Sequence, residues 1–202
     1  MVGVLVACCY GLSFAADVQC CDVALLIINL DSMTVSLAGT GNPYPEEWRT
    51  SSDEFVVDVN AQLLEKARAC GALVVYAYGD YPHLYTGNEP ISFPESIRPT
   101  PADILIPRSG ASTDVFEGTV LLDTLQSHGI QHIVISGVHT GYCIWHSALA
   151  ALRNGLDVTI VADGHSGGSP SYAGSYNAYW PSIGIHVVPL SELDFGLVVD
   201  SS

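Results

Sequence analysis

The sequence predicts a single α/β domain with helices on both faces of a central, mainly parallel sheet of about six strands. Its 202 residues suit one compact domain. Hydrophobic residues make up 49% of the chain and charged residues only 13%, so much of it must be buried. From Val23 onward, short apolar runs alternate with longer segments of helical spacing, which is typical of parallel strands covered by helices.

Six apolar runs are the predicted strands: residues 23–30, 72–78, 103–107, 131–137, 156–162 and 184–189. The helices predicted between them are 53–69, 117–128, 142–154 and a shorter one at 171–180. Gly71, Gly129 and Gly155 each follow a helical segment and are expected to end it as caps. No repeat or linker divides the chain, so we expect residues 16–202 to form one domain.

The first 15 residues have the form of a secretory signal peptide. Residues 2–14 are apolar, too short to span a bilayer, and lead into a small-residue pattern at Ala15. The segment contains no Lys or Arg. The alternative is an extra strand or a retained apolar extension packed on a neighbouring subunit, and a cytoplasmic protein. We expect a secreted protein.

Charge and motifs exclude several classes of partner. Six Lys and Arg against 21 Asp and Glu give a net charge of −15, which repels nucleic acid and anionic lipid. No later stretch is long enough for a membrane helix. No Gly-x-Gly-x-x-Gly or P-loop follows a strand, so we expect no cofactor and a small-molecule substrate as the partner.

Cys143 is the expected nucleophile. It lies after a predicted strand and a tight turn, in the first turn of a helix, where unpaired N–H groups and the helix dipole favour a thiolate. A lone cysteine on an apolar helix is more often a small core residue, and the position of Cys143 by itself does not exclude that alternative.

The run from Gly137 to Ile144, Gly-Val-His-Thr-Gly-Tyr-Cys-Ile, resembles the signature of the isochorismatase-like cysteine hydrolase superfamily, most of all its streptothricin-hydrolase and nicotinamidase-like branches. Residues 116–119, 161–165 and 177–180 resemble further family elements. The resemblance extends from about Val23 to Phe195. It implies a Rossmann-like three-layer α/β/α sandwich, assembly as an oligomer, and hydrolysis of a small amide, ureido or related C–N bond.

The resemblance also implies a catalytic Asp, Lys and Cys together with a cis peptide. The cis peptide falls between Val138 and His139, and the oxyanion donors would be the N–H groups of His139 and Cys143. The Asp and Lys positions depart from the family pattern. Asn29 stands at the Asp position and Gly110 at the Lys position, so neither the base nor the cation is present there.

Nearby side chains could replace the missing groups. Asp31 is two residues beyond Asn29 and is expected on the same face of an extended strand. Arg108, two residues before Gly110, could stand in electrostatically if a loop gap brings it into place, although arginine does not give up its proton. His139 or His146 could serve as the base instead.

The candidates for the substrate pocket are His146 and four aromatic residues, Tyr142, Trp145, Tyr85 and Phe116. The alternative for the aromatic residues is packing in the core. Asp80 and His83 stand near the metal position of metal-binding relatives. Their spacing is one residue too long, so we expect no metal.

Two classes of function remain open. The first is a cysteine-dependent hydrolase. The second is a non-hydrolytic family member that binds a ligand or acts as an isomerase or lyase, and a vinyl-ether hydrolase of the isochorismatase type is a further alternative.

The segment 142–154 carries more apolar residues than one core-facing stripe needs, so we also expect a homo-oligomer. These residues are Ile144, Trp145, Ala148, Leu149 and Leu152.

Overall fold

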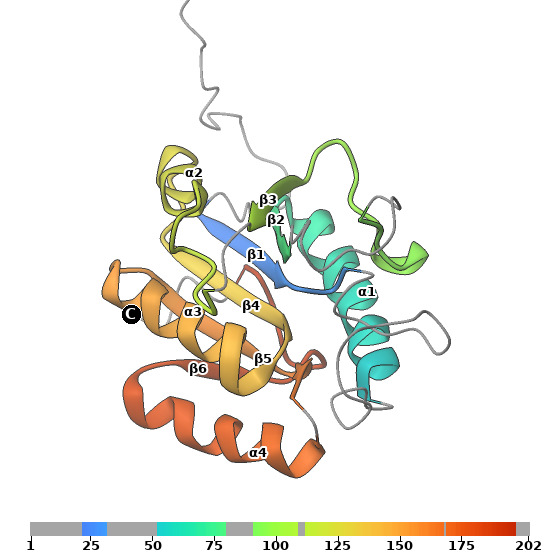
Figure 1. Ribbon diagram of the computed structural model, residues 1–202, viewed down its shortest axis with the longest axis vertical. Coiled ribbons are helices and arrows are strands. Elements are labelled where there is room, and N and C mark those ends of the chain that lie inside the picture. Colours follow the sequence, from blue (N-terminus) through green and yellow to red (C-terminus); the bar gives the residue numbers. More distant parts are fainter. Residues whose placement is uncertain (1–21, 32–51, 80–90, 109–111, 168, 197–202) are drawn as a thin grey trace, which may run out of the picture.

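The computed structural model describes residues 22–31, 52–79, 91–108, 112–167 and 169–196. Within them, six parallel strands form one sheet in the order β3-β2-β1-β4-β5-β6 (Figure 1). The strands are β1 Val23–Ile28, β2 Leu73–Gly79, β3 Ile104–Arg108, β4 His132–Val138, β5 Asp157–Ser166 and β6 His186–Val188. The predicted parallel α/β architecture is confirmed.

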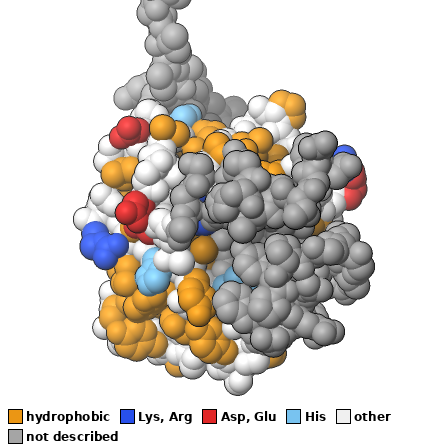
Figure 2. All heavy atoms as spheres, viewed as in Figure 1, with side chains coloured by type: hydrophobic (Ala, Val, Ile, Leu, Met, Phe, Trp, Pro, Cys, Tyr) orange, Lys and Arg blue, Asp and Glu red, His pale blue; other side chains and the backbone are white. Residues whose placement is uncertain are grey.

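Helices cover both faces of the sheet and complete three layers. They are α1 Ser52–Cys70, α2 Leu121–Ser127, α3 Trp145–Arg153 and α4 Pro170–Tyr179, with short helical turns η2 Glu95–Ile97, η3 Thr140–Ile144 and η4 Trp180–Ile183. Figure 1 shows α1 on one side of the sheet and α2, α3 and α4 on the other. Hydrophobic side chains gather on the surface that α3 and α4 form in the view of Figure 2.

The sheet is buried on both faces, which explains why its strands are continuous apolar runs. In β1, Leu25 and Ile27 join the core beneath α1, while Leu26 and Ile28 join the core beneath α2 and α3. Every residue of β1 is buried. Successive side chains point to opposite faces of the sheet, but both faces are covered, so the sequence of β1 does not alternate between apolar and polar residues.

Most element boundaries differ from the predicted ones by one to four residues, and three of these differences have a local reason. β1 ends at Ile28, because Asn29 adopts a left-handed conformation with φ 54°. α2 begins only at Leu121, after Gly118 at φ 69°, and the Thr119 hydroxyl accepts the N–H of Leu121. β5 runs four residues further than predicted, to Ser166, past a register irregularity in its pairing with β4.

Glycine caps end three helical segments, and hydrogen bonds between distant segments link α1 to the C-terminal part of the chain. Gly71, Gly129 and Gly155 have φ values of 76°, 71° and 78°, as expected for residues that end helices. Lys66, the single lysine, donates to the carbonyls of Leu190 and Leu193 and so ties α1 to the C-terminal segment.

The predicted leader, residues 1–15, lies outside the described residues. Cys70 is disulfide-bonded, whereas Cys143 is free. In the part of the chain that the structure describes, no helix combines the length and the apolar character needed to cross a membrane.

Candidate active site

The candidate site lies where the strand order reverses. β1 is flanked by β2 on one side and by β4 on the other, and the chain leaves β1 and β4 toward opposite edges of the sheet. Crevices at such switch points, outside the carboxyl ends of the strands, are where open parallel sheets bind ligands. Asn29 follows β1, and the segment leading to Cys143 follows β4.

Asn29 contacts the sulfur of Cys143 directly. Its Nδ2 donates to Cys143 Sγ at 3.1 Å and to the carbonyl oxygen of Val138 at 3.3 Å. The opposite amide orientation would place Oδ1 against the Val138 carbonyl oxygen, so the contact with Val138 fixes Nδ2 as the atom facing the sulfur. The left-handed backbone at Asn29 is one that asparagine tolerates better than most residues.

The turn between β4 and α3 holds Cys143 at 9% exposure. The peptide bond between Val138 and His139 is cis, at the position that the family resemblance implies. The N–H groups of Tyr142 and Ile144 both donate to the His139 carbonyl oxygen, at 3.0 and 3.2 Å. These bonds fold residues 139–144 into the single wide turn η3, which leads into α3.

A buried hydrogen-bonded chain fixes the start of η3. Thr140 Oγ1 lies 2.9 Å from His165 Nδ1, and His165 Nε2 lies 2.8 Å from Asn177 Oδ1. Asn177 Nδ2 donates to the Ala162 carbonyl oxygen, so its Oδ1 must accept from His165 Nε2. His165 therefore carries a proton on Nε2, and in the neutral ring the Thr140 hydroxyl donates to Nδ1.

Burial lowers the pKa of His165, while its bond to Asn177 and the nearby Asp163 act in the opposite direction. The neutral form is thus the one that this chain of hydrogen bonds uses at pH 7. Sequence reasoning placed His165 in a loop expected to border the site and Asn177 in a family-like element, but it gave neither residue a role. The signal was present in the spacing of residues 161–165, but the link to Thr140 depends on contacts across the sheet.

Asp31 and Arg108 form a second group on the β2 side of β1. Asp31 is fully buried and accepts the N–H of Gly79 at 3.3 Å. Gly79 is paired in register with Arg108, which is 4% exposed. The prediction that Asp31 shares a strand face with Asn29 is wrong, because β1 ends at Ile28 and the left-handed Asn29 breaks the alternation.

The other predicted site residues are spread around this centre. The ring Nδ1 of His146 is hydrogen-bonded to the Thr113 hydroxyl. His139 is partly buried, and burial lowers its pKa. Phe116 packs against the core beneath α2 and α3, and Tyr142 is 48% exposed.

Trp145 packs against α4, with ring centroids 5.7 Å from both Tyr176 and Tyr179. Four further predicted positions, Tyr85, Asp80, His83 and Gly110, lie outside the described residues. Within the described ranges, no three His, Cys, Asp or Glu side chains are grouped so that they could hold a metal ion.

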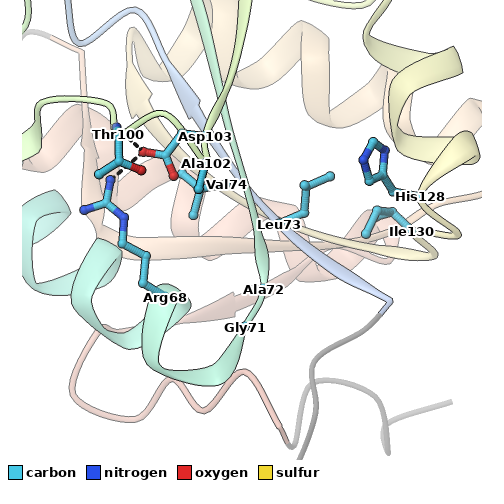
Figure 3. Close-up of a pocket in the computed structure, with 10 residues that line it drawn as sticks. All are labelled: Arg68, Gly71, Ala72, Leu73, Val74, Thr100, Ala102, Asp103, His128 and Ile130. Carbon is cyan, nitrogen blue, oxygen red and sulfur yellow. Dashed lines mark hydrogen bonds and ion pairs between the residues drawn. The ribbon is translucent and has the colours of Figure 1, made fainter. Parts of the chain in front are cut away.

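A cavity of about 420 Å³ opens at the opposite end of the sheet (Figure 3). It lies beside the start of β2, where Arg68 Nη2 donates to Asp103 Oδ2 at 2.6 Å. Because Leu73 and Val74 line it from the amino end of their strand, this cavity is separate from the Cys143 site.

Known proteins resemble this chain over most of its length. A model of the isochorismatase domain family matches residues 23–177. Maleamate amidohydrolase from Pseudomonas putida is 29% identical over 53% of this chain and 58% of its own length. Streptothricin hydrolase from Streptomyces noursei is 28% identical over 71% of this chain and 54% of its own length. The chain therefore spans little more than half the length of these curated relatives.

Among solved structures, an isochorismatase family protein from Desulfovibrio vulgaris superposes with a TM-score of 0.71 and 25% identity. The superposition covers 84% of this chain and 95% of that one. The residues matched by the family model, 23–177, include both Asn29 and Cys143.

Proposed function

We propose that this chain, which belongs to the isochorismatase family, is a cysteine-dependent hydrolase of a small amide, ureido or related C–N bond substrate. The observation that carries the proposal is the free Cys143 sulfur. It sits in the turn after β4, at the switch point of the sheet, with a hydrogen-bond donor 3.1 Å away. A donated hydrogen bond stabilises a thiolate more than a thiol.

The reaction proceeds through a thioester. A base takes the Sγ–H proton, and the sulfur attacks the carbonyl carbon, forming the C–S bond as the carbonyl π electrons move to oxygen. The backbone N–H groups of His139 and Cys143 receive this oxyanion. The C–N bond then breaks, and the nitrogen takes the proton from the base. Water attacks the thioester carbonyl while the base takes one of its protons. The C–S bond breaks, the carboxylic acid leaves, and the proton returns from the base to the Cys143 sulfur.

Asp31 and His139 are the two bases that this proposal retains. His139 immediately precedes η3, and its lowered pKa keeps the imidazole neutral and able to accept a proton at pH 7. Asp31 is buried at the neighbouring strand end. Asn29 cannot be the base, because a carboxamide does not accept the thiol proton at neutral pH.

A second function is favoured by the same asparagine. An amide donor in place of a carboxylate fits a protein that binds a ligand, or rearranges one, without cleaving a C–N bond. Thermal shift with the substrate panel described below separates the two functions. Stabilisation without turnover supports this second function, and turnover across the amides excludes it.

The test of the hydrolase is a panel of maleamate, streptothricin, simple ureas and vinyl ethers, with wild type compared to Cys143→Ala. Wild type should release ammonia or amine, and Cys143→Ala should lose at least about 10³-fold in kcat while its circular dichroism stays unchanged. Mass spectrometry of quenched wild type should show an acyl adduct on Cys143. Full activity in Cys143→Ala would contradict the proposal.

We also propose that the protein is exported. The disulfide at Cys70 supports this, because disulfides persist mainly in oxidising compartments. Amino-terminal sequencing of the protein recovered from its native source should begin near residue 16. An intact Met1 on the recovered protein would contradict export by cleavage.

A further inference from the structure

Asn29 has one hydrogen-bonding atom that the site itself does not use. A carboxamide offers two N–H donors and one oxygen acceptor. Its Nδ2 donates to the Val138 carbonyl oxygen and to Cys143 Sγ. Its Oδ1 is buried and has no hydrogen-bond partner in the described part of the chain. The side chain is 6% exposed, so bulk water does not readily satisfy this oxygen.

We propose that Asn29 Oδ1 accepts a hydrogen bond from the N–H of the substrate's scissile nitrogen, so that the site selects amides and ureido compounds bearing such an N–H over esters and tertiary amides. This inference rests on the proposed hydrolase function and adds the chemical feature by which the substrate is recognised. Asn29 would thus hold the sulfur with one end of its amide and the leaving group with the other.

Geometry places the leaving group within reach. A carbonyl carbon attacked by Cys143 lies about 3–3.5 Å from Sγ in a reactive complex, and the scissile nitrogen is bonded to that carbon. Asn29 already touches Sγ through Nδ2 at 3.1 Å, and Oδ1 is bonded to the same amide carbon as Nδ2. A substrate bound with its scissile nitrogen on the Asn29 side of the sulfur would therefore bring an N–H toward this buried, unpartnered oxygen.

The discrimination follows from what each substrate leaves unpaired. An amide N–H satisfies the buried oxygen without requiring Asn29 to accept or release a proton. An ester presents an oxygen there, which repels Oδ1 and leaves it without a donor. Sites built to bind a substrate N–H or O–H reject analogues that lack the group by far more than apolar pockets reject a changed methyl group.

A second buried asparagine provides the matched control. Asn60 Nδ2 donates to the carbonyls of Val56 and Gly164, and its Oδ1 also has no partner among the described residues. An unpartnered oxygen is therefore not a site by itself. What distinguishes Asn29 is its contact with the nucleophile, which Asn60 on α1 does not make.

The experiment compares maleamate, its N-methyl and N,N-dimethyl amides, and monomethyl maleate. If another panel amide is hydrolysed faster, it and its matching derivatives are used. In wild type, kcat/KM should fall mainly at the second methylation, by at least about 100-fold, because only that step removes the last N–H. In Asn29→Gly, which accepts the left-handed backbone, the amide-to-ester ratio of kcat/KM should drop at least about tenfold. Asn60→Ala should melt at a lower temperature with that ratio unchanged.

Binding provides the same comparison without turnover. In Cys143→Ala, calorimetry should give a Kd for the amide at least about tenfold lower than for the ester, and adding Asn29→Gly should remove the difference. Equal binding of amide and ester, or an amide-to-ester ratio unchanged in Asn29→Gly, would overturn this inference. If only the hydrolase proposal fails, the result is different: amides would bind more tightly than esters, but none would be cleaved.

Discussion

Two glycines determine how closely the turn before Cys143 packs. At Gly137, with φ 120°, a Cβ would overlap the backbone carbonyl oxygen of Ile28 on the neighbouring strand. No side-chain movement relieves that overlap. At Gly141, a Cβ would instead meet the hydroxyl of Tyr172 and lie 2.8 Å from the hydroxyl of Tyr176. The second overlap involves the far ends of side chains on α4, which can move.

Substitution of Gly141 should therefore be harmful but correctable. We expect Gly141→Ala to push Tyr172 away and shift η3, lowering kcat/KM about tenfold through misplacement of Cys143. Adding Tyr172→Phe removes the overlapping oxygen and should restore part of the loss, whereas Tyr172→Phe alone should change little. Steady-state kinetics on the best panel amide measures both effects. A double variant as weak as Gly141→Ala would show that the ring position is not the cause.

The hydrogen-bonded chain from β5 and α4 to η3 controls the same turn from the other side. Thr140 is fully buried, and its hydroxyl donates to the neutral His165. Because His165 on β5 is held in turn by Asn177 on α4, these two elements together fix the first residue of η3. We therefore expect Thr140 and His165 to act as positioning residues for the turn that carries Cys143.

Loss of the Thr140 hydroxyl should affect the rate more than substrate binding. We expect Thr140→Val to lower kcat about 10–100-fold with KM within about threefold of wild type, the range seen when supporting contacts around a site are lost. Thr140→Ser keeps the hydroxyl and should recover most of kcat. If Ser and Val variants are equally impaired, the methyl packing matters and the bond to His165 does not.

The sequence predicted the parts of this molecule that depend on local pattern. The six strands are apolar runs, the caps are glycines after helical segments, and the turn at residues 137–144 is a contiguous motif. The position of Asp31 was mispredicted because one left-handed residue, Asn29, ended β1 early. The role of His165 and the packing of Trp145 against Tyr176 depend on contacts between elements that no local spacing records.

Stability of the whole molecule should depend on pH through a histidine far from the site. His132 is 4% exposed at the start of β4, and burial lowers its pKa from 6.5 to about 4, against a smaller opposing effect of Asp157. Its Nε2 lies 2.9 Å from the Thr159 hydroxyl. The unfolded chain therefore binds a proton more readily than the folded chain between these two pH values.

The free energy of unfolding should consequently fall as pH drops from about 6.5 to about 4, by on the order of 2 kcal/mol from this group. His139 and His165, whose pKa values are also lowered by burial, add to the same trend. Urea unfolding at several pH values measures it. His132→Gln should give a flatter dependence than wild type, and an unchanged slope would rule out His132 as a source.

One surface of the molecule is suited to contact with a second copy. None of the ten residues of α4 is buried, and Tyr172 and Tyr179 are 38% and 50% exposed. Between Gly164 and Ser191 the sequence contains no Lys, Arg, Asp or Glu. We expected Trp145 to be available for an interface, but it packs against Tyr176 of α4. The exposed apolar surface in Figure 2 therefore lies partly on α4 itself.

We therefore predict a homodimer that packs through α4. Two copies that each carry a net charge of −15 repel one another, and an uncharged face is where they can approach most closely. Light scattering at micromolar concentration should give about twice the 21.4 kDa chain mass, less any cleaved leader. Tyr179→Glu should convert the dimer to monomer, because it places a like charge from each copy in an apolar contact. Val120→Glu alters a residue that is 62% exposed next to α2 and should leave the mass unchanged. A wild-type monomer, or equal effects of the two substitutions, would show that α4 is not the interface.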